Sequence, residues 1–140
     1  MDAPALPAGY SGTSLAKKLG IKPGTEVCVM NGPGNYPGLV APLPQGARFV
    51  SRLSSRTDLL HIFASSKAAL ARALRSYRGR IRPDAAVWVS WPKKSAKVPT
   101  DITEDAIREI ALPLGFVDIK VCAVTDVWSG LKLVIRRDLR

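Results

Sequence analysis

The sequence predicts one α/β domain of the Rossmann-like type, with a mostly parallel sheet, helices on both faces and a C-terminal antiparallel hairpin. Three observations predict this class. Strand-length apolar runs alternate with amphipathic helical patterns between residues 58 and 111, which is the order of parallel βαβ units. Two further apolar runs, joined by a short turn, follow at the C-terminus. The chain of 140 residues, 46% of them hydrophobic, has the length and the apolar content of a single packed domain.

The N-terminal part divides into an arm and the start of the domain. Residues 1–12 are rich in Ala, Pro and Gly and are expected to form an extended arm, which leaves residues 13–140 as the domain. A short helix is predicted over Leu15–Leu19, with Thr13 or Ser14 as its N-cap and Gly20 as its stop. A strand over Glu26–Met30 follows a Pro-Gly turn.

The middle of the chain holds the βαβ pattern. The nearly continuous apolar run of Asp58–Ala64 indicates a strand that is covered on both faces. Ser66 is a good N-cap for a helix to about Tyr77. The apolar and Arg residues of this segment fall on opposite faces of such a helix, which makes it amphipathic. The remaining predicted elements are a strand over Ala47–Leu53, a strand over Ala85–Trp91, and a helix capped by Asp101 or Thr103 and stopped by Pro113 and Gly115.

The C-terminal hairpin comprises strands over Phe116–Val124 and Val127–Arg136. We expect it to add an antiparallel edge strand to the sheet, on which Lys132, Arg136 and Arg137 resist edge-to-edge pairing. The order of elements from Asp58 onward resembles the C-terminal half of class I methyltransferases. That resemblance implies a shortened version of the methyltransferase architecture.

A glycine-rich loop directly follows the first strand, which is where a dinucleotide-binding loop would lie. Gly32 and Gly34 provide the first two glycines, but Gly38 is out of register with the Gly-x-Gly-x-x-Gly pattern. The proline-rich segment beyond cannot supply a long helix to bind a pyrophosphate. Met30 stands where methyltransferases typically carry an acidic residue. A structural turn is therefore favoured over a cofactor loop.

Candidate ligand-binding residues lie after the strands, because open α/β sheets bind ligands outside the carboxyl ends of their strands. Trp91 with Lys93 and Lys94 suits an anionic, ring-bearing ligand through stacking and charge, and equally suits a half-buried ring beside solvated lysines. Asp126 is favoured as a turn residue. The full set of candidates is Asn31, Gly32, Gly34, Asn35, Tyr36, Trp91, Lys93, Lys94, Asp126 and Trp128.

No catalytic residue and no metal site is predicted. His61 lies in an apolar run without a neighbouring nucleophile pattern, which favours a hydrogen-bonded core histidine over a general base. Cys28 and Cys122 each lie among apolar residues and are expected to be free thiols. One His and two distant Cys give no zinc-binding spacing.

The charge and the termini limit the partners and the location. The formal net charge is +10, which attracts phosphates and anionic surfaces without a dedicated site. The arginines from Arg72 to Arg82 are favoured as a solvated helix face, and no nucleic-acid-binding motif accompanies them. With no apolar run of about 18 residues and no signal-peptide pattern after Met1, we expect a cytoplasmic protein without a membrane segment.

Several strings along the chain together resemble a bacterial domain-of-unknown-function family of small proteins that has no established activity. The likeness extends from Tyr10 to Arg137, and it implies no catalytic residues. It directs attention to the segments that carry it, which are residues 10–24, 87–94, 101–104, 111–115, 121–124 and 128–134.

The leading hypothesis is a non-catalytic, Rossmann-like module that binds an anionic ligand or a protein partner at the strand ends. The absence of a nucleophile pattern, a metal-ligand set and an intact cofactor loop favours it. The alternative is a shortened S-adenosylmethionine-dependent methyltransferase, which would use that cofactor at the Gly32–Gly34 loop. Sequence-independent nucleic-acid binding is a third hypothesis, based on charge alone.

Overall fold

The computed structural model describes residues 13–140, so the predicted N-terminal arm lies outside the described residues. The observed elements follow the predicted order. They are α1 (Leu15–Leu19), β1 (Glu26–Met30), α2 (Tyr36–Leu39), β2 (Arg48–Val50), β3 (Leu59–Phe63), α3 (Lys67–Arg78), β4 (Ala86–Pro92), η1 (Lys94–Ala96), α4 (Glu104–Ala111), η2 (Leu112–Leu114), β5 (Phe116–Ala123), β6 (Trp128–Ile135) and η3 (Arg137–Leu139).

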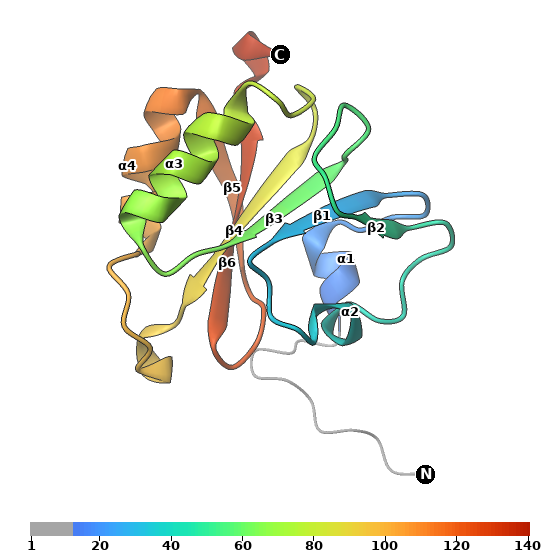
Figure 1. Ribbon diagram of the computed structural model, residues 1–140, viewed down its shortest axis with the longest axis horizontal. Coiled ribbons are helices and arrows are strands. Elements are labelled where there is room, and N and C mark those ends of the chain that lie inside the picture. Colours follow the sequence, from blue (N-terminus) through green and yellow to red (C-terminus); the bar gives the residue numbers. More distant parts are fainter. Residues whose placement is uncertain (1–12) are drawn as a thin grey trace.

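The six strands form one sheet in the order β2-β1-β3-β4-β6-β5 (Figure 1). β2, β1, β3 and β4 are parallel neighbours, and β6 runs antiparallel to both β4 and β5. The helices α3 and α4 cover one face, and α1 and α2 cover the other. The α/β class, the mostly parallel sheet, the two helical faces and the C-terminal antiparallel hairpin are confirmed.

The predicted place of the last strand is wrong. β6 lies between β4 and β5, so β5 is the edge strand and Lys132 lies inside the sheet. Burial gives the physical reason, because β6 buries Leu131, Leu133 and Ile135 fully. β5, in contrast, leaves Ile119 and Val121 about half exposed. The more apolar strand takes the interior position, where both of its edges are hydrogen-bonded.

Side-chain caps fix the helix starts. Ser14, one of the two predicted N-caps of α1, accepts the N–H of Lys17 at 3.2 Å. Thr103 caps α4 by accepting the N–H of Ala106 at 3.1 Å. Asp101, the other candidate for α4, instead accepts the N–H of Lys67 at the start of α3. The loop after β1, predicted as a turn only, also contains the four-residue α2.

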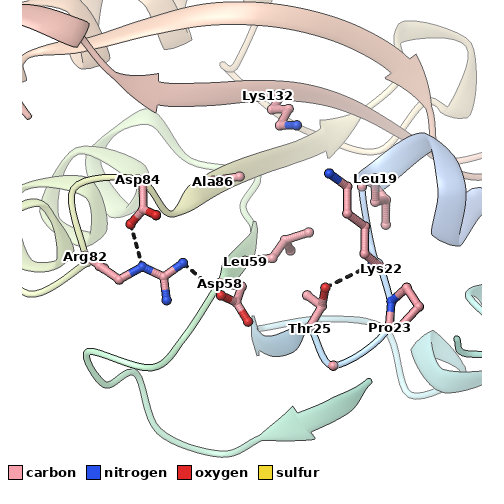
Figure 2. A pocket seen from close by; sticks show the side chains of 12 residues that line it. Leu19, Lys22, Pro23, Thr25, Asp58, Leu59, Arg82, Asp84, Ala86 and Lys132 are labelled. Carbon is pink, nitrogen blue, oxygen red and sulfur yellow. Dashed lines mark hydrogen bonds and ion pairs between the residues drawn. The ribbon is translucent and has the colours of Figure 1, made fainter. Parts of the chain in front are cut away.

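The strand starts at the amino end of the sheet are tied together by charge (Figure 2). Arg82, just before β4, donates to Asp58, just before β3, at 2.8 Å and also to Asp84. The second oxygen of Asp58 accepts the N–H of Glu26 at the start of β1 at 2.8 Å. Three neighbouring parallel strands are thereby connected through one carboxylate.

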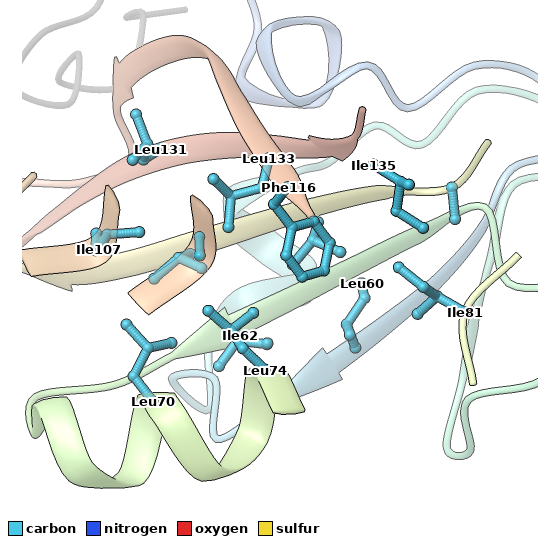
Figure 3. Close-up of a cluster of buried hydrophobic side chains, with 14 of the residues drawn as sticks. Leu60, Ile62, Leu70, Leu74, Ile81, Ile107, Phe116, Leu131, Leu133 and Ile135 are labelled. Atoms are coloured by element: carbon cyan, nitrogen blue, oxygen red, sulfur yellow. The ribbon is translucent and has the colours of Figure 1, made fainter. Parts of the chain in front are cut away.

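The two faces of the sheet carry separate cores. Leu60, Ile62 and Phe116 pack under α3 and α4 in the larger cluster, together with Leu70 and Leu74 of α3 (Figure 3). The smaller cluster lies under α1 and α2. Of the predicted thiols, Cys28 is buried and Cys122 half-buried, and both are free. Within residues 13–140 no helix has the length and apolar character to cross a membrane.

Candidate functional site

The carboxyl ends of the strands β1, β3, β4 and β5 all lie at the same end of the sheet, because these strands run in the same direction. The chain steps from β1 outward to β2 and then crosses to β3 on the other side, so its direction of winding reverses between β1 and β3. Such reversal points open the crevice in which α/β sheets commonly bind ligands. The predicted loops after β1, β3 and β4 and the β5–β6 turn do meet at this edge.

The glycine loop after β1 closes against the protein's own core. A Cβ atom at Gly32 would lie 2.5 Å from Cγ1 of Val29 and 3.5 Å from the ring of Phe63, so this glycine is required by internal packing. A Cβ atom at Gly34 would meet no atom of residues 13–140 within 4 Å, which leaves space at that position. Asn31 adopts a positive φ of 58°, and Asn35 precedes α2 without a side-chain capping bond.

Beneath this loop lies a buried chain of three polar side chains. The hydroxyl of Tyr36 is 2.8 Å from Nδ1 of His61, and Nε2 of His61 is 2.7 Å from Oγ of Ser90. His61 and Ser90 are fully buried and Tyr36 is 3% exposed. A neutral imidazole donates from one nitrogen and accepts at the other, so one hydroxyl donates to the ring and the other accepts from it. Each ring nitrogen therefore has a partner.

Burial keeps this chain neutral. It lowers the pKa of His61 to about 3 and raises the pKa of Tyr36 above its ordinary value. At neutral pH His61 is therefore an uncharged hydrogen-bonding group sealed from solvent. The prediction of a hydrogen-bonded core histidine is confirmed, and its two partners are Tyr36 and Ser90.

Aromatic rings surround the chain on the same face of the sheet. Phe63 stacks on His61 at 4.4 Å and meets Tyr36 and Trp128 edge-on at 5.8 and 5.1 Å. Phe49 of β2 meets Tyr36 edge-on at 5.9 Å. Phe63 thus fills the space beside Gly32 at the β1–β3 reversal, and the open space lies to one side, next to β2.

That open space is a pocket of about 430 Å³ at the carboxyl ends of β1 and β2. Val29, Phe49 and Val50 form its strand side. Ser51 contributes a hydroxyl group and Tyr36 its ring, while the Tyr36 hydroxyl is bonded to His61. Among residues 13–140 no charged side chain lines this pocket. Among residues 13–140 the lining residues are Val29, Gly32, Pro33, Tyr36, Pro37, Phe49, Val50 and Ser51.

The predicted site residues fall into separate places. Tyr36 and Trp128 come together through Phe63. Trp91 packs in the core on the opposite face, under α3 and α4, and is only 8% exposed. The sheet therefore separates its ring from that of Trp128.

The lysines and the turn lie beside the end of β4. The N–H of Lys93 donates to the carbonyl of Val127 at 2.6 Å, which ties the end of β4 to the β5–β6 turn. Lys94 begins η1 and is exposed. In the turn, Asp126 is exposed, and Thr125 Oγ1 accepts the N–H groups of Val127 and Trp128. None of these residues lines the pocket beside β2.

The contributors to this end of the sheet that sequence reasoning missed include Phe49, Phe63 and Ser90. Ser90 carried a detectable signal, because it is the one hydroxyl in the otherwise apolar β4 run. It also lies two residues from Trp88 and so shares a face with that ring. Phe49 and Phe63 looked like ordinary strand residues, and only the pairing of β1 with both β2 and β3 brings them to the glycine loop.

Comparison with known proteins identifies the fold. No family model matches the chain and no curated protein matches it, so the resemblance to a domain-of-unknown-function family stays a prediction. Among solved structures, a SAM-dependent methyltransferase from Aquifex aeolicus superposes with a TM-score of 0.63 at 12% identity. The superposed region covers 87% of this chain and 88% of the Aquifex aeolicus chain.

Two further structures agree. A putative type 11 methyltransferase from Sulfolobus solfataricus has a TM-score of 0.54 at 16% identity and covers 80% of this chain and 85% of its own. The fibrillarin pre-rRNA processing protein of Methanococcus jannaschii has a TM-score of 0.59 at 10% identity, covering 86% of this chain and 73% of its own. The chain therefore has the fold of class I methyltransferases, as the element order predicted.

Proposed function

We propose that this chain binds an adenosyl compound of the S-adenosylmethionine type in the pocket at the carboxyl ends of β1 and β2. One observation carries the proposal: an apolar pocket of about 430 Å³ lies on the glycine loop of a sheet whose solved neighbours include a protein named as a SAM-dependent methyltransferase and one named as a type 11 methyltransferase. The volume lies within the range of small-molecule sites. The proposal keeps the hypothesis of a binding module and takes its ligand from the methyltransferase alternative.

The lining residues fit the adenosine half of such a ligand. Phe49 is 38% exposed and offers an aromatic surface to a flat base, while Pro33 and Pro37 supply apolar walls. The open space at Gly34 allows a ligand to approach the backbone there. The Ser51 hydroxyl can donate to or accept from a ribose hydroxyl or a base nitrogen.

The charged half of S-adenosylmethionine finds no partner among the pocket residues. Among residues 13–140 no charged side chain lines the pocket, and β2 ends at Val50, followed directly by Ser51 rather than by a carboxylate. The sulfonium and amino-acid groups would therefore remain at the mouth, in contact with water. S-adenosylmethionine supplies an electrophilic methyl group when bound.

The buried polar chain acts in this proposal by positioning. His61 holds the hydroxyl of Tyr36 at 2.8 Å, which fixes the Tyr36 ring as the floor of the pocket. His61 itself does not serve as a general base toward the ligand, because burial lowers its pKa to about 3 and Tyr36 stands between it and the pocket.

The test is calorimetric titration of the protein with S-adenosylmethionine, S-adenosylhomocysteine and adenosine. A ring stacked on a base contributes about 1–3 kcal/mol, so F49A should weaken binding of all three about fivefold or more. L112A is the matched control, because Leu112 is an exposed apolar side chain at 46% exposure in η2, outside the pocket. Absence of binding at millimolar ligand, or equal weakening by both variants, would contradict the proposal.

Methyl transfer is the second candidate, and the names of the structural neighbours favour it. The measurement is formation of S-adenosylhomocysteine from S-adenosylmethionine when the protein is mixed with small-molecule, protein and RNA fractions of a cell extract. Turnover that F49A removes would support catalysis at this pocket. Tight binding of S-adenosylhomocysteine without turnover in any fraction would favour the binding module.

A further inference from the structure

A second cavity, of about 480 Å³, lies at the opposite end of the sheet, where β1, β3 and β4 begin (Figure 2). Its walls come from the segment between α1 and β1, from the starts of β3 and β4, and from Lys132 of β6. This end of an α/β sheet is not where sequence reasoning looks for a ligand. The cavity is nevertheless the more polar of the two, and its lining side chains include five that carry charge: Lys22, Asp58, Arg82, Asp84 and Lys132.

Two lysines face each other across this cavity. Lys22 and Lys132 both project into it, with their ammonium ends turned toward one another (Figure 2). The Lys132 nitrogen lies against the segment after α1, because a Cβ atom at Gly20 would lie 3.6 Å from it, in ordinary van der Waals contact. Among residues 13–140 neither lysine forms an ion pair.

The environment of Lys132 shows an unbalanced positive field. Burial lowers the pKa of Lys132, and the nearby charges of Lys120 and Lys22 lower it further. Lys120 is itself held close by, since its ammonium group donates to the carbonyl of Lys18 at 3.1 Å. A bound anion would relieve the repulsion among these groups.

The carboxylates of the cavity do not neutralise the lysines, because another cation already engages them. Arg82 donates to Asp84 through Nε and to Asp58 through Nη2 at 2.8 Å. The second oxygen of Asp58 accepts the N–H of Glu26. The lining consequently keeps a net positive charge that is concentrated at the lysine side.

We propose that this cavity binds the phosphate group of a small phosphorylated molecule between the ammonium groups of Lys22 and Lys132. A phosphate dianion matches two ammonium groups in charge and offers several acceptor oxygens to their donors. The cavity is larger than one phosphate requires, so an organic body can lie along the wall of Arg82 and Asp84. The carboxylate oxygens of Asp58 and Asp84 on that wall have further lone pairs, which can accept hydrogen bonds from the hydroxyl groups of a sugar.

The experiment is titration of the full chain with ribose 5-phosphate, with inorganic phosphate and with uncharged ribose, at constant ionic strength set by NaCl. Binding is measured by calorimetry. The variants are K132M, which keeps most of the apolar stem, and K22Q. The matched control is K97Q, which removes the same unit charge from an exposed lysine beyond η1, outside this cavity. Circular dichroism confirms that each variant is folded.

We expect ribose 5-phosphate to bind and ribose not to bind. K132M and K22Q should each weaken binding about tenfold or more, because each removes a charge-assisted hydrogen bond, while K97Q should change it less than about twofold. Lys132→Arg, which keeps the charge, should retain part of the affinity. Equal weakening by K132M, K22Q and K97Q would show that only net charge matters and would overturn the proposal. Absence of binding at about 10 mM ribose 5-phosphate, a concentration that would reveal even a very weak Kd, would overturn it as well.

Two further readouts distinguish this site from general attraction of anions. In an NMR pH titration of the lysine side chains, the pKa of Lys132 should rise when ribose 5-phosphate is present, and an unchanged titration would count against the site. A DNA duplex without terminal phosphates should not displace ribose 5-phosphate. Displacement by that duplex would show recognition of a nucleic-acid backbone instead and would overturn the proposal.

Discussion

The two ends of the sheet are built from opposite materials. At the carboxyl end, where α/β sheets commonly bind ligands, the side chains of Tyr36, His61 and Ser90 form a neutral hydrogen-bonded series among aromatic rings. Phe63 fills the space beside Gly32 at this end. At the amino end, the starts of β1, β3 and β4 meet around an open cavity that is lined by charged side chains. The methyltransferase fold therefore does not determine by itself which end is open to charged ligands.

The two ends of the sheet depend on solvent in different ways. The carboxyl end is stabilised by burial, so its energetics should respond to pH and to packing. The amino end is stabilised by partly exposed ion pairs, which are screened and individually weak. Changes in pH, in packing at the glycine loop and in charge at the amino end test this contrast.

The largest effect concerns His61 and pH. Burial lowers its pKa to about 3 in the folded chain, while an unfolded histidine titrates near 6.5. The unfolded state therefore binds a proton that the folded state does not bind. The contribution of His61 to the free energy of unfolding is fully present above pH 6.5 and is lost progressively as the pH falls from 6.5 toward 3. Between pH 7 and pH 4.5 the free energy of unfolding should fall by roughly 2–3 kcal/mol, measured by urea denaturation.

This window isolates the histidine. His61 is the single histidine of the sequence, and carboxylates titrate mainly below pH 4.5. The control is H61Q, whose amide can bond both hydroxyls without titrating in this range. The slope should disappear in H61Q. The same slope in both proteins would mean that His61 is not the titrating group.

How far sequence reasoning reaches can be judged from the same two ends. The strands and long helices follow from apolar runs and from caps such as Ser66 and Thr103, because these signals are local. The insertion of β6 beside β4 depends on pairing between distant segments, and local pattern does not encode it. His61 could be assigned to the core because its apolar run is a local signal. Its hydrogen-bond partners Tyr36 and Ser90 could not be named, because they are distant in the sequence.

The cavity at the amino end was beyond reach for a related reason. Its residues come from four separate parts of the sequence, and Lys132 was expected on an outer edge. The candidate residues after the strands lie at the carboxyl end of the sheet, as the element order predicted. The two tryptophans were then divided between its faces, since Trp91 packs under α3 and α4 while Trp128 packs with Phe63 on the other side.

The second prediction compares two glycines of one loop. In G32A the new methyl group would lie 2.5 Å from Val29 and 3.5 Å from Phe63, so either the loop or these side chains must shift. Overpacking of this kind costs about 1–3 kcal/mol of unfolding free energy. G34A meets nothing within 4 Å and should be neutral or stabilising by up to about 1 kcal/mol. Chemical denaturation of both variants measures the difference.

The outcome decides whether the carboxyl end is tightly packed at the glycine loop. A loss in G32A alone means that Gly32 serves the core and that a ligand must use the side of the loop near Gly34 and Phe49. Equal stability of both variants would mean that the loop moves freely, and the packing described for Phe63 would then not limit access to the β1–β3 reversal.

The smallest effect belongs to the ion pairs of the amino end. D58A removes a carboxylate whose two oxygens bind Arg82 and the N–H of Glu26, so it leaves two donors without their acceptor. Burial opposes ionisation of Asp58, but the bonds from Glu26 and Arg82 together hold its pKa below the ordinary value. With its side chain about one-third exposed, solvent screening reduces the expected loss to about 1 kcal/mol.

D84A is the matched comparison, because Asp84 binds the same guanidinium group but is 69% exposed. It should lower the melting temperature less than D58A does. High salt should shrink the loss in D58A only in part, because the bond from the Glu26 N–H connects two strands and is not an ion pair. If 1 M NaCl made D58A and D84A equally stable, the amino end would be held by screened charge alone, and Asp58 would have no part in joining β1 to β3.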